Sequence, residues 1–387
     1  MFSRLYGAIT KVRNSLYETG VFKSFSLDVP TVSVGNITVG GTGKTPLVAF
    51  VAEILAANGE KVCVISRGYG RENSKRRVLV SDSEKILAEA KTAGDEPFEL
   101  AQKLLGKAIV IADANRVSAG NWAREKFGIT AFVLDDAFQH LRIRRDINIV
   151  TIDATNPFGN EKLLPSGILR EPLENLKRAD AVVITRANLV KDVSNLKSRI
   201  KEFNSVCPIF VAENKISSLV DLKNFPAKAQ GTANYELRIR NYEKKPTINH
   251  QPLTTNRYFA FCALGNPNNF FEQLRKENFN VVSTEEFPDH HFYTQKDIAK
   301  LEIKARNVNA EILLTTAKDA VKLKNLRFDL PCFVVESEMI FDGENNFRDW
   351  LTAKQTAAQT RARRKIPNFK FAAFVSLSCK DETSTKL

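Results

Sequence analysis

The sequence predicts an α/β protein in which a P-loop NTPase-like domain with a mostly parallel sheet is followed by a second, smaller α/β domain. From residue 31 to residue 212, short β-branched runs alternate with stretches of helical length, which is typical of parallel strands with helices on both faces of the sheet. The first run leads into a glycine-rich turn that ends in Gly43-Lys44-Thr45, the layout of a phosphate-binding loop. A shorter α/β alternation resumes at residue 257.

The expected elements of the first domain, residues 31–212, follow this alternation. We predict strands at residues 32–35, 61–65, 108–111, 131–135, 147–152, 181–185 and 209–212. We predict helices at residues 44–58, 96–105 and 117–127. Residues 213–256 are polar, with several lysines and prolines, and we expect an irregular connecting segment there.

The smaller α/β domain is expected at residues 257–350. Its predicted strands are residues 258–264, 280–283, 312–315 and 332–335, and its predicted helices are residues 269–276 and 295–306. Residues 351–387 are expected to form a basic C-terminal helix and tail that includes Arg361, Arg363, Arg364 and Lys365.

Composition limits the class of protein. At 387 residues the chain is long enough for two domains, and its five scattered cysteines contain no C-x-x-C pair. This fits a reducing cytosol and argues against a disulfide framework or a structural zinc site. No apolar run approaches the roughly 18 residues of a membrane span. The net charge of +13 suits an anionic partner, but it leaves nucleic acid, a phosphorylated substrate and acidic lipid open.

Residues 1–30 begin with an amphipathic pattern. Apolar side chains recur at helical spacing, and cations lie between them: Phe2, Leu5, Ile9, Val12 and Leu16 against Arg4, Lys11 and Arg13. A basic amphipathic helix of this kind can lie in a membrane interface. The same stripe could instead pack on the neighbouring domain, and the pattern alone allows both interpretations.

The glycine-rich turn is the most specific motif for nucleotide binding. Glycines allow backbone N–H groups to curl around phosphates, while the following helix directs its positive N-terminus at them. Lys44 would reach the phosphates, and the Thr45 hydroxyl would hold magnesium. Thr38 stands where the consensus has glycine. The predicted nucleotide-binding residues are Gly40, Gly41, Thr42, Gly43, Lys44 and Thr45.

Two aspartates close the predicted strand at residues 131–135. Asp135 and Asp136 would reach the carboxyl edge of the sheet, beside the phosphates, and could hold Mg²⁺ directly or through water. Paired aspartates at a strand end are also common in turns. The phosphate-binding loop upstream favours the metal-binding interpretation.

Two candidate acid–base groups lie outside these motifs. Asp95 opens a predicted helix and could be either its N-cap or a general base that takes the proton of an attacking hydroxyl. His290 and His291 follow Asp289 on a polar turn, where they could be metal ligands, acid–base groups or surface residues. No Cys or further His lies near enough in sequence to complete a zinc set.

Two loops mix flexible backbone with guanidinium groups. Residues 66–71 offer Arg67, Tyr69 and Arg71 to an anionic or sugar-phosphate ligand, and residues 164–172 offer Arg170 and Glu171. Either loop could instead be a solvated turn.

Taken together, these stretches resemble one family, the tetraacyldisaccharide 4′-kinases of lipid A synthesis. Each motif is weak alone, but all occur in the same order along most of the chain: residues 33–36, 40–46, 66–70, 94–97, 135–140, 163–172, 263–267, 289–291 and 315–320. Ala137 stands where we expect glycine, and the end beyond Lys365 has no counterpart. The resemblance implies transfer of the ATP γ-phosphate to the 4′-hydroxyl of tetraacyldisaccharide 1-phosphate, which gives the 1,4′-bisphosphorylated precursor lipid IVA.

The resemblance also implies residue roles. Lys44 and Thr45 would bind ATP and Mg²⁺, and Asp135 and Asp136 would form the acidic metal-binding pair. Asp95 would be the base, paired with His290 from the other domain, and Glu171 would lie near the metal or the sugar.

The implied setting is a lipid surface. The N-terminal helix would anchor a peripheral, monomeric enzyme beside its acylated glucosamine disaccharide 1-phosphate on the cytoplasmic face of the inner membrane. No nucleic acid is expected as a partner.

Two other classes of protein are compatible with parts of the sequence. A dimerising NTPase switch would carry lysine at Val39, and a GTPase would require an aspartate that Thr185-Arg186-Ala187-Asn188 lacks. A nucleic-acid-binding ATPase would fit the net charge of +13, but no helicase-like series of motifs occurs and the basic residues are not interleaved with aromatics. Both are weaker than the lipid-kinase hypothesis.

Overall fold

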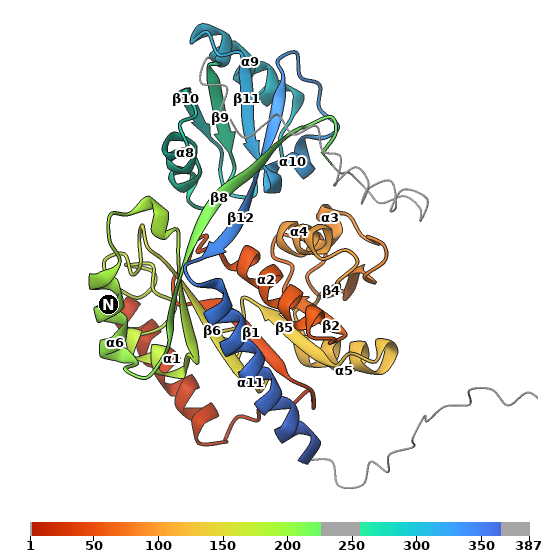
Figure 1. Cartoon of the computed structure of the whole chain (residues 1–387), viewed down its shortest axis with the longest axis vertical. Coiled ribbons are helices and arrows are strands. Elements are labelled where there is room, and N and C mark those ends of the chain that lie inside the picture. The colour runs from red at the N-terminus through yellow and green to blue at the C-terminus, as the bar shows by residue number, and fades with distance from the viewer. Residues whose placement is uncertain (1, 226–255, 365–387) are drawn as a thin grey trace, which may run out of the picture.

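The computed structural model describes residues 2–225 and 256–364, and within them every strand belongs to one twelve-stranded sheet (Figure 1). Its strand order is β10-β9-β11-β12-β8-β7-β6-β1-β5-β2-β4-β3. We call residues 2–212 with 341–364 the first lobe, and residues 219–225 with 256–335 the second lobe. Figure 1 shows the second lobe above the first, with β8 and β12 running between them.

The first lobe has a parallel sheet except at its edge, where β3 runs antiparallel to β4. Its strands are β1 Thr31–Asn36, β2 Val62–Ser66, β3 Val78–Ser81, β4 Ala108–Ala112, β5 Ala131–Asp135, β6 Ile147–Asp153 and β7 Ala181–Thr185. Its helices are α1 Phe2–Glu18, α2 Lys44–Ala57, α3 Ala90–Ala93, α4 Asp95–Lys103, α5 Arg116–Phe127, η1 Leu173–Arg178, η2 Ala187–Leu189, α6 Ser194–Phe203 and α11 Glu344–Arg364.

The second lobe is a smaller α/β unit. Its strands are β9 Tyr258–Cys262, β10 Val281–Glu286 and β11 Ile312–Thr316, and its helices are α8 Pro267–Lys276, α9 Gln295–Asn307 and α10 Ala317–Leu323. The three strands and the start of β12 are parallel. The predicted fold class, a P-loop NTPase-like sheet with a smaller α/β unit, is confirmed, although β3, α3, α6 and α10 were not predicted.

Two long strands, β8 Ile209–Asp221 and β12 Cys332–Phe341, join the lobes as an antiparallel pair from Ala212↔Phe341 to Asp221↔Phe333. The prediction of an irregular segment is therefore wrong for residues 213–221. Their polar side chains suggested a loop, but β8 is only half-buried, and a strand of this kind tolerates them. Residues 226–255 lie outside the described residues.

Helix α11 begins at Glu344, inside the range predicted for the smaller domain. Phe347 and Leu351 are fully buried in the same apolar cluster as Val48 and Val51 of α2, so the helix packs on the first lobe. The chain thus leaves the first lobe through β8, forms the second lobe and returns through β12. Of the basic cluster predicted in the tail, Lys365 lies outside the described residues.

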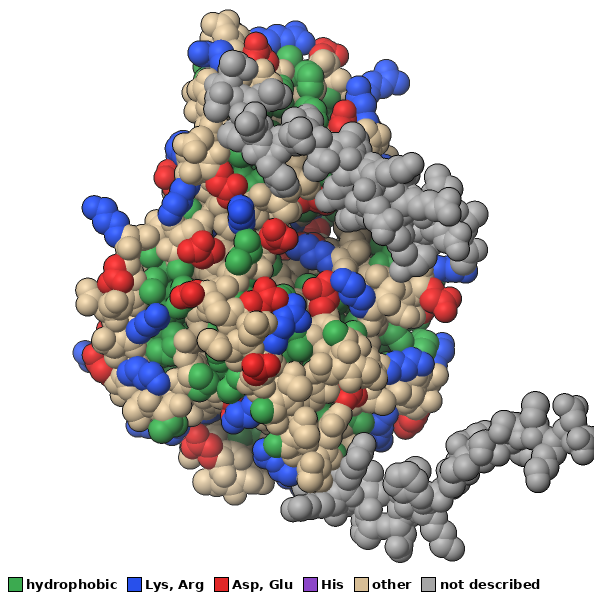
Figure 2. All heavy atoms as spheres, in the orientation of Figure 1, with side chains coloured by type: hydrophobic (Ala, Val, Ile, Leu, Met, Phe, Trp, Pro, Cys, Tyr) green, Lys and Arg blue, Asp and Glu red, His purple; other side chains and the backbone are tan. Residues whose placement is uncertain are grey.

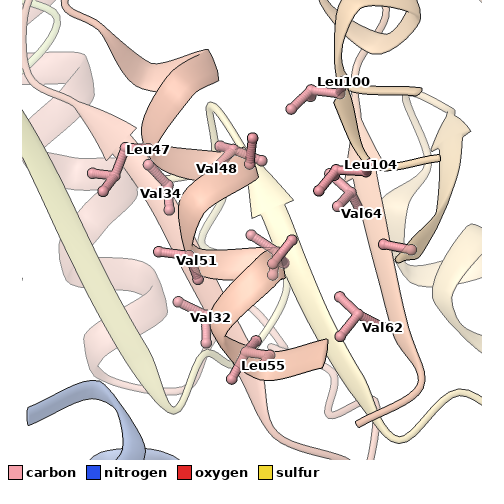
Figure 3. Packing of buried hydrophobic residues seen from close by; sticks show 14 of the residues in the cluster. Val32, Val34, Leu47, Val48, Val51, Leu55, Val62, Val64, Leu100 and Leu104 are labelled. Atoms are coloured by element: carbon pink, nitrogen blue, oxygen red, sulfur yellow. The ribbon is translucent and has the colours of Figure 1, made fainter. Parts of the chain in front are cut away.

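The core beside the glycine-rich loop fixes the position of α2. Leu47, Val48, Val51 and Leu55 of α2 lie against Val32 and Val34 of β1, as Figure 3 shows, and all six are buried. β1 is buried along its whole length, as expected for a central parallel strand covered on both faces. The loop between β1 and α2 is therefore held at both ends by packed apolar side chains.

Helix α1 packs with its polar side inward. Thr10 and Asn14 are buried, whereas four of the five side chains of the apolar stripe are exposed: Phe2 at 75%, Leu5 at 59%, Ile9 at 60% and Val12 at 59%. The Asn14 amide donates a 3.0 Å hydrogen bond to the buried Glu171 carboxylate. The alternative in which the apolar stripe packs on the neighbouring domain is therefore wrong. None of the helices in the described part of the chain is both long and apolar enough to cross a bilayer.

The docking of α11 leads to a stability prediction. The Phe347 ring stacks on Phe341 with centroids 4.6 Å apart and has no exposed surface. Phe347→Ala should lower the free energy of unfolding by about 3–5 kcal/mol, because it leaves a cavity between α11 and the sheet. Urea unfolding measures this. The exposed Asp349→Ala, on the same helix, should stay within about 0.5 kcal/mol of the parent protein. Equal stability of the two variants would contradict this packing.

Candidate active site

A cleft of about 1470 Å³ separates the two lobes. The glycine-rich loop, Asp135 and Asp136 line it from the first lobe, and His290 and Lys318 line it from the second. In Figure 2, side chains of both charges gather around the hollow between the lobes. The cleft lies at the carboxyl ends of the parallel strands, where open α/β sheets bind ligands.

The glycine-rich loop has the backbone that phosphate binding requires. Gly43 caps α2 with a φ of +75°, and a Cβ at this position would lie 3.3 Å from the Thr185 side chain, so only glycine fits without strain. The Thr42 side chain is buried and accepts a 3.0 Å hydrogen bond from the Asn36 amide. Lys44 is the first residue of α2, so the loop ends at the positive terminus of a helix.

Asp135 ends β5 with its carboxylate buried. Oδ2 accepts a 2.7 Å hydrogen bond from the Ser66 hydroxyl at the end of the neighbouring strand β2. Burial raises the pKa of the Asp135 carboxyl to about 6, and the adjacent charge of Asp136 adds to the rise. A buried carboxylate with a raised pKa gains most from a nearby cation.

Asp136 is surrounded by positive charge. Arg170 Nη1 donates to both of its carboxylate oxygens at 2.8 and 3.0 Å, and Lys44 Nζ lies 3.6 Å from Oδ1. Burial acts to raise the pKa of Asp136, but Lys44 and Arg170 hold it below its ordinary value. Asp136 is therefore ionised at neutral pH and links the loop lysine to Arg170.

Across the cleft, Asp95 contacts two cationic groups of the second lobe. His290 Nδ1 donates to Asp95 Oδ2 at 2.9 Å, and Lys322 Nζ lies 2.7 Å from the same oxygen. Burial acts to raise the pKa of Asp95, but the hydrogen bonds from His290 and Lys322 bring it below its ordinary value. The hydrogen bond from His290 to Asp95 in turn raises the pKa of the imidazole, although burial opposes the rise.

Two lysines of α10 were missed as site residues. Lys322 pairs with Asp95, and Lys318 Nζ lies 3.0 Å from Asp289 and 3.7 Å from Glu96. Their i, i+4 spacing places both on one helical face, but nothing in the sequence indicates that they pair with Asp95, Glu96 and Asp289. Asp95 and Glu96 lie more than 200 residues away, so only the fold brings the four together.

The structure brings some of the other predicted residues to the cleft and not others. Arg67 and Tyr69 line it. Arg71 does not, because its buried guanidinium donates to the carbonyls of Ala112 and Ser74. Glu171 does not line it either.

The Glu171 carboxylate is fully buried beneath α1. Besides Asn14, it accepts hydrogen bonds of 2.6 Å from Asn175 and from Arg178. It therefore fixes α1 to the first lobe. In this structure neither Arg71 nor Glu171 has the surroundings that its predicted role requires.

Fold and cleft together define a two-lobed enzyme of the P-loop NTPase class, with charged groups from both lobes facing the phosphate-binding loop. The model of the tetraacyldisaccharide-1-P 4′-kinase family matches residues 1–356, and the chain belongs to this family.

Relatives agree with this assignment. A tetraacyldisaccharide 4′-kinase of Geobacter metallireducens is 38% identical over 82% of this chain and 86% of its own length. One of Pelobacter propionicus is 37% identical over 84% and 82%. The crystal structure of LpxK from Aquifex aeolicus in complex with ATP matches with a TM-score of 0.66 and 30% identity, over 91% of this chain and 97% of that one.

The family and enzyme class predicted from the sequence are thus confirmed: the chain is an ATP-dependent kinase that phosphorylates the 4′ position in lipid A biosynthesis. The NTPase-switch and nucleic-acid hypotheses are not supported by these comparisons. The roles of individual residues stay predictions.

The raised pKa of Asp135 predicts a pH dependence of stability in the metal-free protein. Between the ordinary carboxyl pKa of about 4 and about 6, the folded protein holds a proton that the unfolded chain has lost. The stability contributed by this group is therefore lost as pH rises through that window, by on the order of 2 kcal/mol. Urea unfolding at several pH values should show the loss in the parent protein relative to Asp135→Asn. A difference that does not change with pH would contradict the raised pKa, and the exposed Asp349→Asn is the control.

Proposed function

We propose that residues 40–45 hold the phosphates of ATP, and that the acceptor hydroxyl of the lipid disaccharide lies between them and Asp95. The observation that best supports this is that His290, which is hydrogen-bonded to Asp95 at 2.9 Å, lines the same cleft as the phosphate-binding loop. Phosphoryl transfer depends mainly on positioning and on neutralising charge. Lys44, held 3.6 Å from Asp136 by the start of α2, is the group that would meet the transferred phosphate.

The acidic pair fits a magnesium ion. Mg²⁺ prefers hard oxygen ligands, and the site offers the Thr45 hydroxyl with the carboxylates of Asp135 and Asp136. Asp135 is buried beside a second carboxylate, and its raised pKa indicates that a cation would be favoured there. We therefore propose that Thr45, Asp135 and Asp136 hold Mg²⁺, which would neutralise phosphate charge during transfer.

Asp95 is proposed as the general base. Its low pKa keeps the carboxylate ionised at neutral pH, as a proton acceptor must be. His290 and Lys322 both contact Oδ2, so Oδ1 would receive the proton of the 4′-hydroxyl. The imidazole of His290 would orient the carboxylate, and its raised pKa keeps it a donor in that hydrogen bond.

Arg67 and Tyr69 are proposed to contact the sugar-phosphate acceptor. Both line the cleft, and the Tyr69 ring, 69% exposed, lies 5.8 Å from the His290 ring. An exposed aromatic ring beside a reacting centre can pack on a sugar face, and a guanidinium can pair with phosphate. Arg170 would act indirectly, by holding Asp136.

The exposed stripe of α1 is proposed to rest on the lipid surface in which the acylated substrate lies. Four exposed apolar side chains with Arg4 and Lys11 beside them match an interfacial helix. We propose a peripheral enzyme on the cytoplasmic face of the inner membrane, where ATP is available. We further propose that it acts as a monomer, because the two lobes of one chain complete the cleft.

The direct test uses purified protein, Mg-ATP and tetraacyldisaccharide 1-phosphate in detergent micelles, with mass spectrometry of the lipid. The expected product is heavier by one phosphoryl group and absent with Lys44→Ala. Asp95→Ala should lower turnover by about two orders of magnitude or more while ATP still binds, because it removes the base. Near-normal turnover in that variant would remove Asp95 from the role, and the exposed Glu84→Gln is the control.

The membrane role of α1 has its own test. Ile9→Asp places a charge on the exposed apolar stripe and should weaken binding to anionic phospholipid vesicles about tenfold or more, since burying one such side chain contributes roughly 2 kcal/mol. Vesicle co-sedimentation measures the change. Ser15→Asp adds the same charge to an exposed position off the stripe and should have a much smaller effect. Equal binding of both variants would argue against α1 as the contact.

A further inference from the structure

The second lobe brings a lysine of α10, Lys318, to the cleft, and the function described so far gives it no role. Figure 1 shows α10 at the end of the second lobe that faces α4 of the first lobe, the helix that begins at Asp95. Lys318 lines the cleft, and its side chain is 15% exposed. Lysine side chains are rarely covered to this extent unless they are paired.

The ammonium group of Lys318 has two carboxylate partners, one on each lobe. Lys318 Nζ lies 3.0 Å from Asp289 Oδ1 and 3.7 Å from Glu96 Oε1. Burial acts to lower the pKa of Lys318, but the charges of Glu96 and Asp289 raise it above its ordinary value, so the group is a cation at neutral pH. Both partners also line the cleft, and an anion bound there would compete with them for the same cation.

Toward α4, Lys318 is next to the proposed base. Glu96 follows Asp95 at the start of α4, and Lys322, one helical turn after Lys318, lies 2.7 Å from Asp95 Oδ2. The two lysines lie on the same face of α10. The 4′-hydroxyl that is proposed to meet Asp95 would therefore also be near Lys318.

Toward the phosphate-binding loop, Asp289 is the link. A Cβ on Gly265 would lie 3.1 Å from Asp289 Oδ2 and 3.9 Å from the Gly41 amide nitrogen, so Gly265 closely approaches both. The carboxylate that holds Lys318 is therefore beside the glycine-rich loop. Lys318 thus has the proposed base on one side and the proposed phosphate site on the other.

The glycine-rich loop itself carries one cation, Lys44. A dimerising NTPase switch would have a second lysine at position 39, but this chain has Val39 there, with its side chain 38% exposed. Phosphoryl transfer spreads charge over the oxygens of the transferred group, and a cation brought from another part of an enzyme accelerates it by about 10³- to 10⁵-fold. Lys318 is placed to supply this second charge from the other lobe.

We propose that Lys318 is a catalytic residue that contacts the transferred phosphoryl group and neutralises the charge that develops on it. The reaction forms a bond between the 4′-oxygen and phosphorus and breaks the bond from phosphorus to the β,γ-bridging oxygen, whose electron pair leaves with ADP. Asp95 Oδ1 takes the hydroxyl proton, and Lys318 neither gives nor takes one. Because Asp289 and Glu96 hold the ammonium group at the cleft before the reaction, little reorganisation is needed when charge develops. This inference rests on the proposed binding of ATP by residues 40–45 and on Asp95 as the base.

The first test is the steady-state kinetics of Lys318→Ala with Mg-ATP and tetraacyldisaccharide 1-phosphate in detergent micelles. An interaction made only in the transition state lowers kcat and kcat/KM together when it is removed. We expect kcat to fall about a hundredfold or more, while the KM for ATP stays within about threefold of the parent value. Lys304→Ala is the control, because it removes another ion pair of the second lobe, with Glu285 at 2.6 Å, that does not line the cleft.

A transition-state analogue separates contact with the phosphoryl group from support of the fold. Aluminium fluoride, bound with Mg-ADP and the lipid acceptor, imitates the phosphoryl group during transfer. Lys318→Ala should weaken the binding of aluminium fluoride by about a hundredfold and the binding of Mg-ADP alone by less than about threefold, as measured by titration calorimetry. Lys318→Arg keeps the positive charge and should recover most of the aluminium fluoride binding.

A double variant tests the alternative in which Lys318 only neutralises Asp289. In that case Lys318→Ala is slow because it leaves an unpaired carboxylate, and adding Asp289→Asn should restore turnover. If Lys318 acts on the phosphoryl group, the double variant should have a kcat as low as that of Lys318→Ala.

The outcomes are distinct. Recovery in the double variant, or unchanged binding of aluminium fluoride in Lys318→Ala, would overturn the role of Lys318. Near-parent turnover in Lys44→Ala or Asp95→Ala would overturn the proposed function instead. Slow Lys44→Ala and Asp95→Ala variants beside a parent-like Lys318→Ala would overturn only the inference drawn here.

Discussion

The antiparallel pairing of β8 with β12 is the constraint on which the arrangement of the molecule depends. Because the second lobe is inserted between these two strands, one continuous sheet runs from β10 to β3. Through this pairing the second lobe faces the carboxyl edge of the first across the cleft. Asp95 and His290 lie far apart in the sequence, but this arrangement of the lobes brings their side chains within 2.9 Å of each other.

Most carboxylates in and near the cleft are paired with cationic side chains. Asp136 is paired with Lys44 and Arg170, Asp95 with Lys322 and His290, and Asp153 with Arg186. Buried or half-buried ions require such partners. Phosphate groups entering the cleft would compete with carboxylates for the same cations, so binding exchanges one set of pairs for another rather than introducing bare charge. Asp135, whose raised pKa reflects burial beside a second carboxylate, is the exception, which agrees with the proposal that it holds a cation.

Most of the first lobe's central sheet was predictable because its signals are local. Buried parallel strands such as β1 and β5 appear as apolar runs, and a glycine-rich turn has few alternatives. The prediction failed where stability comes from distant partners. The outer part of β8 is polar and depends on β12 for its pairing, and the start of α11 is set by Phe347 packing on α2. Asn14 and Glu171, separated by more than 150 residues, show no sequence signal that they meet.

A short chain of hydrogen bonds connects helix α1 to the residues beside the phosphate-binding loop. The Tyr6 hydroxyl donates to the Arg170 carbonyl at 2.9 Å, and the Arg170 guanidinium holds Asp136. If the protein rests on lipid through the exposed apolar stripe of α1, as proposed, its cleft would lie close above the headgroups. The acceptor could then react without its acyl chains leaving the bilayer, and enzyme and acceptor would find each other by diffusion in two dimensions. Turnover would follow the surface density of acceptor in the membrane rather than its amount per volume.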